Sequence, residues 1–207
     1  YYKLTVGNII TEITSTLRCG IMNFTIQQDD SLYLLIMPNS DKAKGFVKID
    51  AAKGEVWGYN PAHRIYQGWG EPAGFNGWFY IKIEKKIASK GTFSGNEISR
   101  DDSIQNKKDI GGFIGFKMSK GEVLRLSIGT SFSSLEGAKK NLATEIGNKS
   151  FNEVLAISKQ KWETALSQIQ VETNTEKDKR IFYTAMYHSM QHPRLMSDVD
   201  GIYPKFA

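Results

Sequence analysis

The periodicity of the apolar residues changes near Thr130, and this change constrains the fold more than any other feature of the sequence. Before Thr130, β-branched and aromatic residues alternate with polar ones in short runs, and Gly, Pro, Asn or Asp separate these runs. After Thr130, apolar residues recur at the spacing of amphipathic helices. Strands followed by helices predict a β-sandwich domain over residues 1–130 and a helical segment over residues 131–207.

The runs before Thr130 have the length and alternation of antiparallel strands. In the last run, Leu124, Leu126 and Ile128 share one face, which predicts a buried side of the sheet. Arg125 and Ser127 lie on the other, wetter face. The candidate strands are YKLTV, IITEITST, MNFTIQQ, LYLLIMP, GFVKIDA, GEVWGY, GWFYIKIEK, GGFIGFKMS and EVLRLSIGT.

Capping boxes mark the starts of the helices after Thr130. In such a box, a Ser or Thr accepts a hydrogen bond from the backbone three residues later, and a Glu there reaches back. The boxes predict helices over SSLEGAKKNLATEI, over SFNEVLAISKQKWETALSQIQ and over the stretch that ends at Pro193. The predicted pairs are Ser133 with Glu136, Ser150 with Glu153, and Thr173 with Glu176.

The third predicted helix, DKRIFYTAMYHSMQH, has apolar or aromatic groups nearly all round. A helix of this kind packs on two sides and is not a simple surface helix. A second partner for it is hard to find within these 207 residues. We therefore expect it to open a further helical domain, of which the sequence contains only the start. Its apolar residues are Ile181, Phe182, Tyr183, Ala185, Met186, Tyr187 and Met190.

Composition and charge exclude several classes of protein. The sequence contains no apolar run of the roughly 18 residues that span a membrane, and its first residues lack the pattern of a signal peptide. The net charge of +5 is spread over stretches of mixed sign, so neither nucleic acid nor a membrane is an expected partner. A single cysteine, Cys19, excludes an internal disulfide and is expected to pack as a small hydrophobic residue.

The segment RIYQGWGEPAGFNGWFYIKI concentrates aromatic residues among glycines. Exposed Trp and Tyr rings can stack on sugars, so the segment is a candidate binding surface. The alternative is that the later rings belong to a strand whose two faces are both packed. Trp69 lies between glycines, where a loop and a binding role are favoured over a core role. The rings are Tyr66, Trp69, Phe75, Trp78, Phe79 and Tyr80.

Two other patterns near the end of the sequence carry possible chemistry. His188 and His192 have the four-residue spacing of zinc ligands on a helix, but the pattern lacks a glutamate and a third ligand, which favours packed or capping histidines. Asp198 and Asp200, in SDVDG, resemble part of a calcium loop, but an EF-hand needs further ligands, which favours an Asx turn after the helix. Nucleophile elbow, P-loop and dinucleotide fingerprints are absent from the sequence.

Several segments, taken in order, resemble a known family. They are YYKLTVGNIITEITSTLRCGIMNFTI, NPAHRIYQGWGEPAGFNGWFYIKI, KGEVLRLSIGTSFSSLEGAKKNLATEI and FYTAMYHSMQHPRLMSDVDGIYP. Together they resemble the amino-terminal region of the family-92 glycoside hydrolases, which are calcium-dependent, exo-acting α-mannosidases. The most specific part is GTSFSSLEGAKKNL followed later by FYTAMYH and SDVDG.

The resemblance implies a mainly β fold with helices at its C-terminal end. Its β part would be an antiparallel supersandwich of the galactose-mutarotase type, and the linker helices would lead to an (α/α)6 barrel beyond this sequence. The implied reaction is an inverting hydrolysis of terminal mannose from α-mannosides. By the same resemblance, the catalytic acid and base and the calcium ligands lie outside the segment, which alone is expected to be inactive.

The resemblance also implies a site, partners and a location. Asp198 or Asp200 would bind mannose hydroxyls, and the aromatic residues Trp78, Phe79 and Tyr80 would supply an apolar wall to the pocket. Trp69 is a further candidate for sugar binding. The expected partners are a mannose-containing glycan and the protein's own (α/α)6 domain, and the expected location is the periplasm or exterior of a bacterium. The alternatives are a non-catalytic carbohydrate-binding module that uses Trp69 and Trp78, and a purely structural domain.

Overall fold

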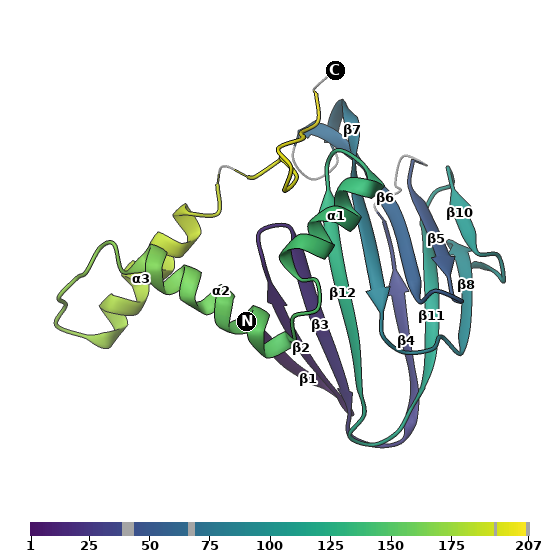
Figure 1. Ribbon diagram of the computed structural model, residues 1–207, viewed down its shortest axis with the longest axis horizontal. Helices are drawn as coiled ribbons and strands as arrows, with labels where there is room; N and C mark the ends of the chain where they lie inside the picture. The colour runs from purple at the N-terminus through teal and green to yellow at the C-terminus, as the bar shows by residue number, and fades with distance from the viewer. Residues whose placement is uncertain (39–43, 66–68, 193, 206–207) are drawn as a thin grey trace.

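The computed structural model describes residues 1–38, 44–65, 69–192 and 194–205, and the side chains at positions 64, 65 and 69 are also outside the description. In the described residues all strands precede all helices (Figure 1), which confirms the predicted order of the two parts. The strands are β1 Tyr2–Val6, β2 Ile9–Ser15, β3 Cys19–Ile26, β4 Asp30–Ile36, β5 Phe46–Asp50, β6 Glu55–Ile65, β7 Trp69–Ile83, β8 Ser89–Ser94, β9 Glu97–Ser99, β10 Ser103–Gln105, β11 Ile110–Met118 and β12 Val123–Ser131. The helices are α1 Leu135–Glu145, α2 Phe151–Leu166 and α3 Glu176–Ser189.

The strands form two antiparallel sheets that enclose an apolar core. One sheet has eight strands in the order β1-β2-β3-β12-β7-β6-β5-β10, and the other has four in the order β4-β11-β8-β9. Alternate residues of the strands face the space between the sheets, as in Phe116 and Met118 of β11 and Leu124 and Leu126 of β12. This burial confirms the inner face that the sequence predicts for β12 and the β-sandwich class of the fold.

A second core lies between the eight-stranded sheet and the helices. Ala138 and Leu142 of α1, with its C-cap Ile146, pack with Ile21 and Tyr80 of the sheet, and α1 lies across the sheet in Figure 1. This helix covers the face of β12 that was expected to be wetter, so Ser127 is only 7% exposed there. Cys19 is buried in the same core, and burial, followed by the nearby charge of Glu145, raises the pKa of its thiol to about 12.

The helix starts agree with the predicted boxes at one position and differ at two. Ser150 and Glu153 form the predicted capping box of α2. The N-cap of α1 is Ser134 and not Ser133, because the Ser134 side chain accepts a hydrogen bond from the backbone of Gly137. Likewise Thr175, which accepts from the backbone of Asp178, caps α3 in place of Thr173. At both positions a neighbouring hydroxyl residue takes the cap, which spacing alone does not distinguish.

Helix α3 projects from the sandwich together with α2 and packs against α2 along one side (Figure 1). The rings of Trp162 and Tyr187 lie 4.6 Å apart between their centres, and the Tyr183 hydroxyl donates to the Ile169 carbonyl oxygen over 3.0 Å. No residue of α3, all of which is described, is buried, and Ile181 is 57% exposed. The two-sided packing expected from its sequence is therefore not seen among the described residues.

The strand predictions missed the short strands β8, β9 and β10 and shortened β6 and β7. The latter pair continues as a long ribbon in which His63 lies opposite Pro72 and Ile65 opposite Trp69, with register shifts on either side of His63. Trp69, expected in a loop, is thus the first residue of a strand. Pairing with a distant partner overrides the local turn signal of the glycines. Within the described helices, none is long and apolar enough to cross a membrane.

Candidate functional site

The SDVDG sequence forms a tight turn at residues 197–202, and its backbone closes on itself. The Asp198 amide donates to the Ile202 carbonyl oxygen over 2.7 Å, and the Gly201 amide donates to the Asp198 carbonyl oxygen over 3.0 Å. Gly201 has a φ of 84°, which glycine adopts without strain. The turn therefore holds Asp198 and Asp200 in fixed relative positions, close to the C-terminal end of the described chain.

Asp198 fastens this turn to the sandwich and to α1. Its carboxylate accepts a hydrogen bond from the Ser131 hydroxyl at 2.9 Å and from the Asn141 amide nitrogen at 2.7 Å. The Asp198 residue is only 4% exposed. A Cβ atom at Gly137 would lie 2.4 Å from an Asp198 carboxylate oxygen, so the helix surface can approach only because residue 137 is glycine. The structure thus gives Asp198 an anchoring role.

Asn141 is the centre of the contact between the turn, α1 and β12. This side chain is fully buried. Its amide nitrogen also donates to the Thr130 carbonyl oxygen over 2.8 Å, and its oxygen accepts from the Val199 amide over 2.9 Å. Because Asn141 is hydrogen-bonded to Asp198, Thr130 and Val199, this buried polar cluster holds the turn in one position.

Arg18 and Glu145 hold the turn from the other side. The Arg18 guanidinium donates to the Ser197 carbonyl oxygen over 2.6 Å and forms an ion pair with Glu145 over 2.6 Å. Thr16 and the Arg18 amide also donate to the Glu145 carboxylate. Burial by itself would raise the pKa of Glu145, but the hydrogen bonds from Thr16 and Arg18 outweigh it and hold that pKa below its ordinary value.

The Arg18–Glu145 pair predicts a pH-dependent stability. Because the folded-state pKa of Glu145 lies below the unfolded value of about 4.3, its interactions stabilise the fold above that value and are lost as the pH falls through the folded pKa. We expect the free energy of unfolding to fall on acidification below about pH 5. Urea unfolding at several pH values checks this, with Glu145→Gln as the control. If the free energy of unfolding fell equally steeply with pH in both proteins below pH 5, Glu145 would not be the cause of the acid sensitivity.

Asp200 lies at the outer side of the turn and is less enclosed than Asp198. Its carboxylate forms an ion pair with Lys140 of α1 over 2.8 Å, and 24% of its side chain is exposed. The hydrogen bond from Lys140, followed by the Ile202 amide, lowers the pKa of Asp200, so the group is ionised near neutral pH. An ionised, partly exposed carboxylate can accept hydrogen bonds from sugar hydroxyls, since each oxygen has more than one acceptor direction.

The aromatic candidates occupy two different environments. Phe79 packs against the core between the sheets, and Tyr80, 8% exposed, belongs to the second core. Trp78 packs against that second core and makes an edge contact with Tyr59, with ring centres 5.0 Å apart. These positions match the alternative of a strand packed on both faces. A sugar-binding role for Trp78, Phe79 and Tyr80 remains a prediction.

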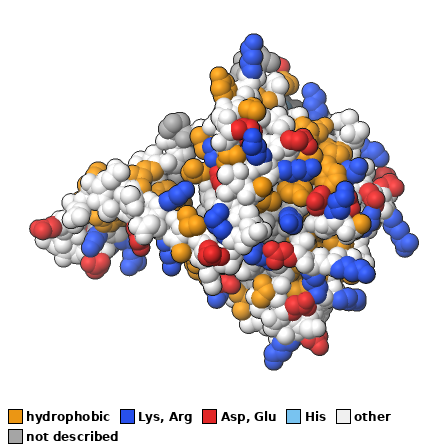
Figure 2. Space-filling model, viewed as in Figure 1, with side chains coloured by type: hydrophobic (Ala, Val, Ile, Leu, Met, Phe, Trp, Pro, Cys, Tyr) orange, Lys and Arg blue, Asp and Glu red, His pale blue; other side chains and the backbone are white. Residues whose placement is uncertain are grey.

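Part of the β6–β7 ribbon lies next to the anchored turn. Phe75 of β7 packs on Phe132 with ring centres 5.9 Å apart, and Phe132 follows Ser131, which binds Asp198. Hydrophobic side chains also gather over β5 and β6 on the face that carries α1, among interspersed basic and acidic groups (Figure 2). The side chains of Tyr66 and Trp69 lie outside the described residues. Phe132 therefore links the ribbon to the residue that holds the turn.

The described residues do not fit a metal site. Nowhere in the described ranges do three or more His, Cys, Asp or Glu side chains come together in a way that could hold an ion. Asp198 is used by Ser131 and Asn141, and Asp200 by Lys140. Because α3 ends at Ser189, His188 and His192 do not share one helical face. The described residues therefore offer no ligand set for calcium or zinc.

The sequence pointed to Asp198 and Asp200 but missed their partners. Asn141 carried a usable signal, since it follows Ala138 by three residues and precedes Leu142, and so lies on the apolar face of its helix. A polar residue on that face predicts a buried hydrogen-bond cluster. Arg18 and Lys140 carried no such signal, because isolated basic residues usually face solvent.

Comparison with protein families decides the identity of the chain. Residues 1–131 match the model of the glycosyl hydrolase family 92 N-terminal domain, and residues 137–207 match the model of the family's catalytic domain. The chain belongs to glycosyl hydrolase family 92. No curated protein matches it. In this family 92 chain, the anchored turn lies within the part that matches the catalytic domain, and the Ser131 that binds it lies at the end of the N-terminal domain match.

Solved structures of family 92 enzymes share the fold of this chain. An inverting mannosidase from Bacteroides thetaiotaomicron superposes with a TM-score of 0.82 at 21% identity, over 97% of this chain and 27% of the other. An α-mannosidase from the same organism gives a TM-score of 0.80 at 23% identity, over 94% of this chain, and was also solved with mannoimidazole. At these identities the likeness establishes the fold alone. The chain spans about a quarter of the length of these relatives, 27% in both.

Proposed function

We propose that this family 92 chain is the amino-terminal region of an α-mannosidase that removes terminal mannose with inversion of configuration. The observation that carries the proposal is the match of both family 92 models in sequence order, over residues 1–131 and 137–207. The printed descriptions of the similar structures, an inverting mannosidase and an α-mannosidase bound to mannoimidazole, support the substrate class.

In this proposal the chain has a supporting role in the reaction. The catalytic acid and base would lie outside it, as would the ligands of the calcium ion that assists the reaction in the parent enzyme. The sandwich and α1 would hold the turn through Asp198, Asn141 and Arg18, and Asp200 would accept a hydrogen bond from a mannose hydroxyl at the edge of the pocket. A periplasmic or extracellular location and contact with an (α/α)6 domain belong to the same proposal.

The activity is tested with the intact enzyme that contains this chain. We expect hydrolysis of 4-nitrophenyl α-mannoside and of α-linked mannobiose, with β-mannose as the first product in a proton NMR time course, because inversion of an α-linkage yields the β-anomer. A chelator should abolish the activity and added calcium should restore it. Release of α-mannose, or no hydrolysis of any α-mannoside, would contradict the proposal.

The role of Asp200 is tested by Asp200→Asn in the intact enzyme. The substitution keeps the shape and removes the charge that strengthens a hydrogen bond to a sugar hydroxyl, so we expect kcat/KM to fall roughly tenfold. The melting temperature should change little, because the ion pair with Lys140 is at the surface. Lys140→Met, which removes the partner and keeps the carboxylate, is the matched control. Unchanged kinetics in Asp200→Asn would remove the sugar contact.

A further inference from the structure

The described helices lie against the eight-stranded sheet and leave the outer face of the four-stranded sheet uncovered (Figure 1). This outer face is nevertheless apolar. In β4, Leu32 is buried in the sandwich core, whereas Tyr33 and Leu35 face outward with 59% and 63% of their surface exposed. The residue after β4, Met37, is 65% exposed. A sheet face that meets water normally carries polar side chains. An exposed apolar face of this kind is typical of binding surfaces.

Three aromatic rings lie flat on this face, each over a glycine of the neighbouring strand. Phe113 is paired with Gly91, Phe93 with Gly111, and Tyr33 with Gly115. A Cβ atom would lie 2.5 Å from the Phe113 ring at Gly91, 2.2 Å from the Phe93 ring at Gly111, and 2.6 Å from the Tyr33 ring at Gly115. One face of each ring therefore rests on a glycine backbone. Phe93 and Phe113 are partly exposed and Tyr33 is mostly exposed, so the outer faces of the rings are open to a ligand.

We propose that the rings of Tyr33, Phe93 and Phe113 form a glycan-binding surface, separate from the candidate site at the anchored turn. The apolar face of a pyranose stacks on an aromatic face, and rings held parallel to a sheet offer such faces side by side. Tyr33, Phe113 and Phe93 lie on the neighbouring strands β4, β11 and β8, and each is displaced from the next by one strand and two residues. Their Cα atoms are therefore about 8 Å apart, so neighbouring rings can contact successive sugars of a chain. The choice of a glycan as the ligand rests on the proposed glycosidase function.

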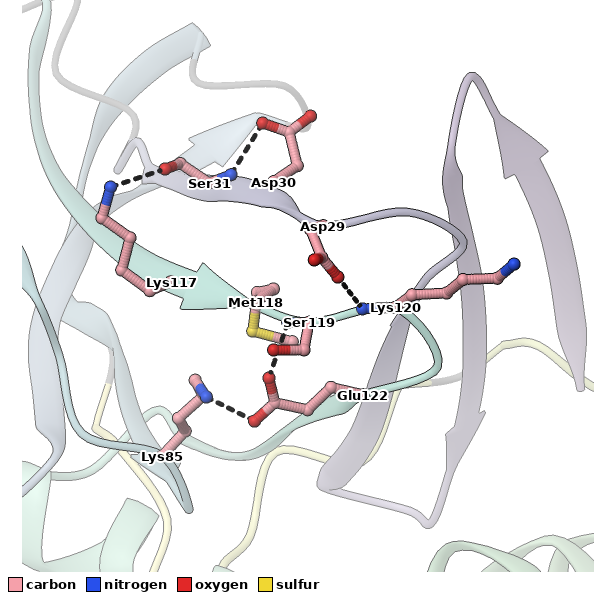
Figure 3. Close-up of a pocket in the computed structure, with 9 residues that line it drawn as sticks. All are labelled: Asp29, Asp30, Ser31, Lys85, Lys117, Met118, Ser119, Lys120 and Glu122. Atoms are coloured by element: carbon pink, nitrogen blue, oxygen red, sulfur yellow. Dashed lines mark hydrogen bonds and ion pairs between the residues drawn. The ribbon is translucent and has the colours of Figure 1, made fainter.

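Polar groups at one end of the ring surface complement the stacking. Lys117 and Ser31, the next outward pair after Gly115 and Tyr33, are joined by a hydrogen bond of 3.4 Å. Both line an open hollow of 790 Å³ whose other lining groups include Asp30 (Figure 3). Figure 3 shows the hollow rimmed by amino, hydroxyl and carboxylate groups, the types that bind sugar hydroxyls.

The charges on this face do not favour a polyanion. At the outward positions of β4, β11 and β8, all of which are described, Lys117 is the one cation. In the adjoining hollow, the three lysines are balanced by three carboxylates, those of Asp29, Asp30 and Glu122. Binding to a nucleic acid needs several Lys or Arg side chains that neutralise phosphates. A neutral sugar polymer needs none. The ring surface therefore matches the chemistry of a neutral glycan.

The surface is tested by native gel electrophoresis of the intact enzyme with soluble α-mannan in the gel. We expect the polysaccharide to retard the wild-type protein and Tyr33→Ala to raise the apparent dissociation constant at least fivefold. The matched control is Tyr2→Ala, since Tyr2 is a similarly exposed tyrosine, at 56%, on β1 of the other sheet. Gly115→Ala, which displaces the Tyr33 ring without removing it, should also weaken binding.

The outcomes separate this surface from its alternatives. The proposal is overturned if α-mannan retards the wild type and Tyr33→Ala equally. It is also overturned if the wild type is retarded neither by α-mannan nor, in a second gel, by an α-glucan. A wild-type dimer that Tyr33→Ala converts to a monomer in sedimentation also overturns it, because the face would then be a contact between copies. Hydrolysis of 4-nitrophenyl α-mannoside should be the same in both proteins. If retardation depends on Tyr33 but no α-mannoside is hydrolysed, the proposed function fails and the glycan surface stands.

Discussion

Asp198→Ala is expected to destabilise the protein by about 3 kcal/mol, because two hydrogen bonds to a charged, buried group are lost and the Ser131 hydroxyl loses its acceptor. Asn141 would also keep one fewer partner in a fully buried position. The free energy of unfolding in urea measures the change. Hydrogen exchange should locate it, since the Gly201 amide is protected only while the turn is closed.

In the intact enzyme the same substitution should lower kcat/KM roughly a hundredfold or more, since a misplaced turn moves every group that it carries. Asp198→Asn is the control, because it keeps an acceptor for Asn141 and a group that can bond Ser131. We expect its loss of stability to be the smaller of the two. If Asp198→Ala had the same free energy of unfolding and the same hydrogen exchange at Gly201 as the wild type, the anchoring role would be refuted.

Gly129→Ala is expected to cost about 3 kcal/mol of stability by forcing α1 away from β12. A Cβ atom at residue 129 would lie 2.3 Å from the carbonyl oxygen of Ala138 and 2.8 Å from the Cβ of Leu142. Neither atom is the end of a flexible side chain, so the helix itself must move. The candidate site should move with it, because Asn141 of α1 holds the turn.

The matched control for Gly129→Ala is Gly20→Ala on the neighbouring strand. There the nearest atom to an added Cβ is the Thr14 carbonyl oxygen at 3.5 Å, an ordinary contact distance. We expect Gly20→Ala to change the free energy of unfolding by less than about 0.5 kcal/mol. Calorimetry and urea unfolding of both variants make the comparison. Equal stability of the two would mean that α1 does not need this close approach.

The two matched domains meet in one buried polar cluster. Ser131 ends β12, Asn141 lies in α1, and Asp198 lies beyond α3, yet their side chains form one buried cluster. Arg18, at the start of the chain, joins the same turn through Ser197. A substitution in the sandwich can therefore alter the position of the turn from a distance.

Much of the architecture was determined by the sequence itself. The change of period near Thr130 and the alternation in β12 predicted strands before helices and one buried face, since both signals depend on neighbours within the same element. The capping box at Ser150 was likewise local. The SDVDG pattern predicted the turn, because its last residue, Gly201, can adopt a left-handed φ without strain.

Tertiary structure alone decided how these elements are used. Trp69 became part of a strand through pairing with Ile65, and Ser127 became buried because α1 crosses its face. The enclosure of Asp198, the pairing of Asp200 with Lys140 and the rings over Gly91, Gly111 and Gly115 all join residues far apart in the chain. A local pattern reports which face of an element is apolar, but the identity of the group that meets this face is fixed only when the whole chain packs.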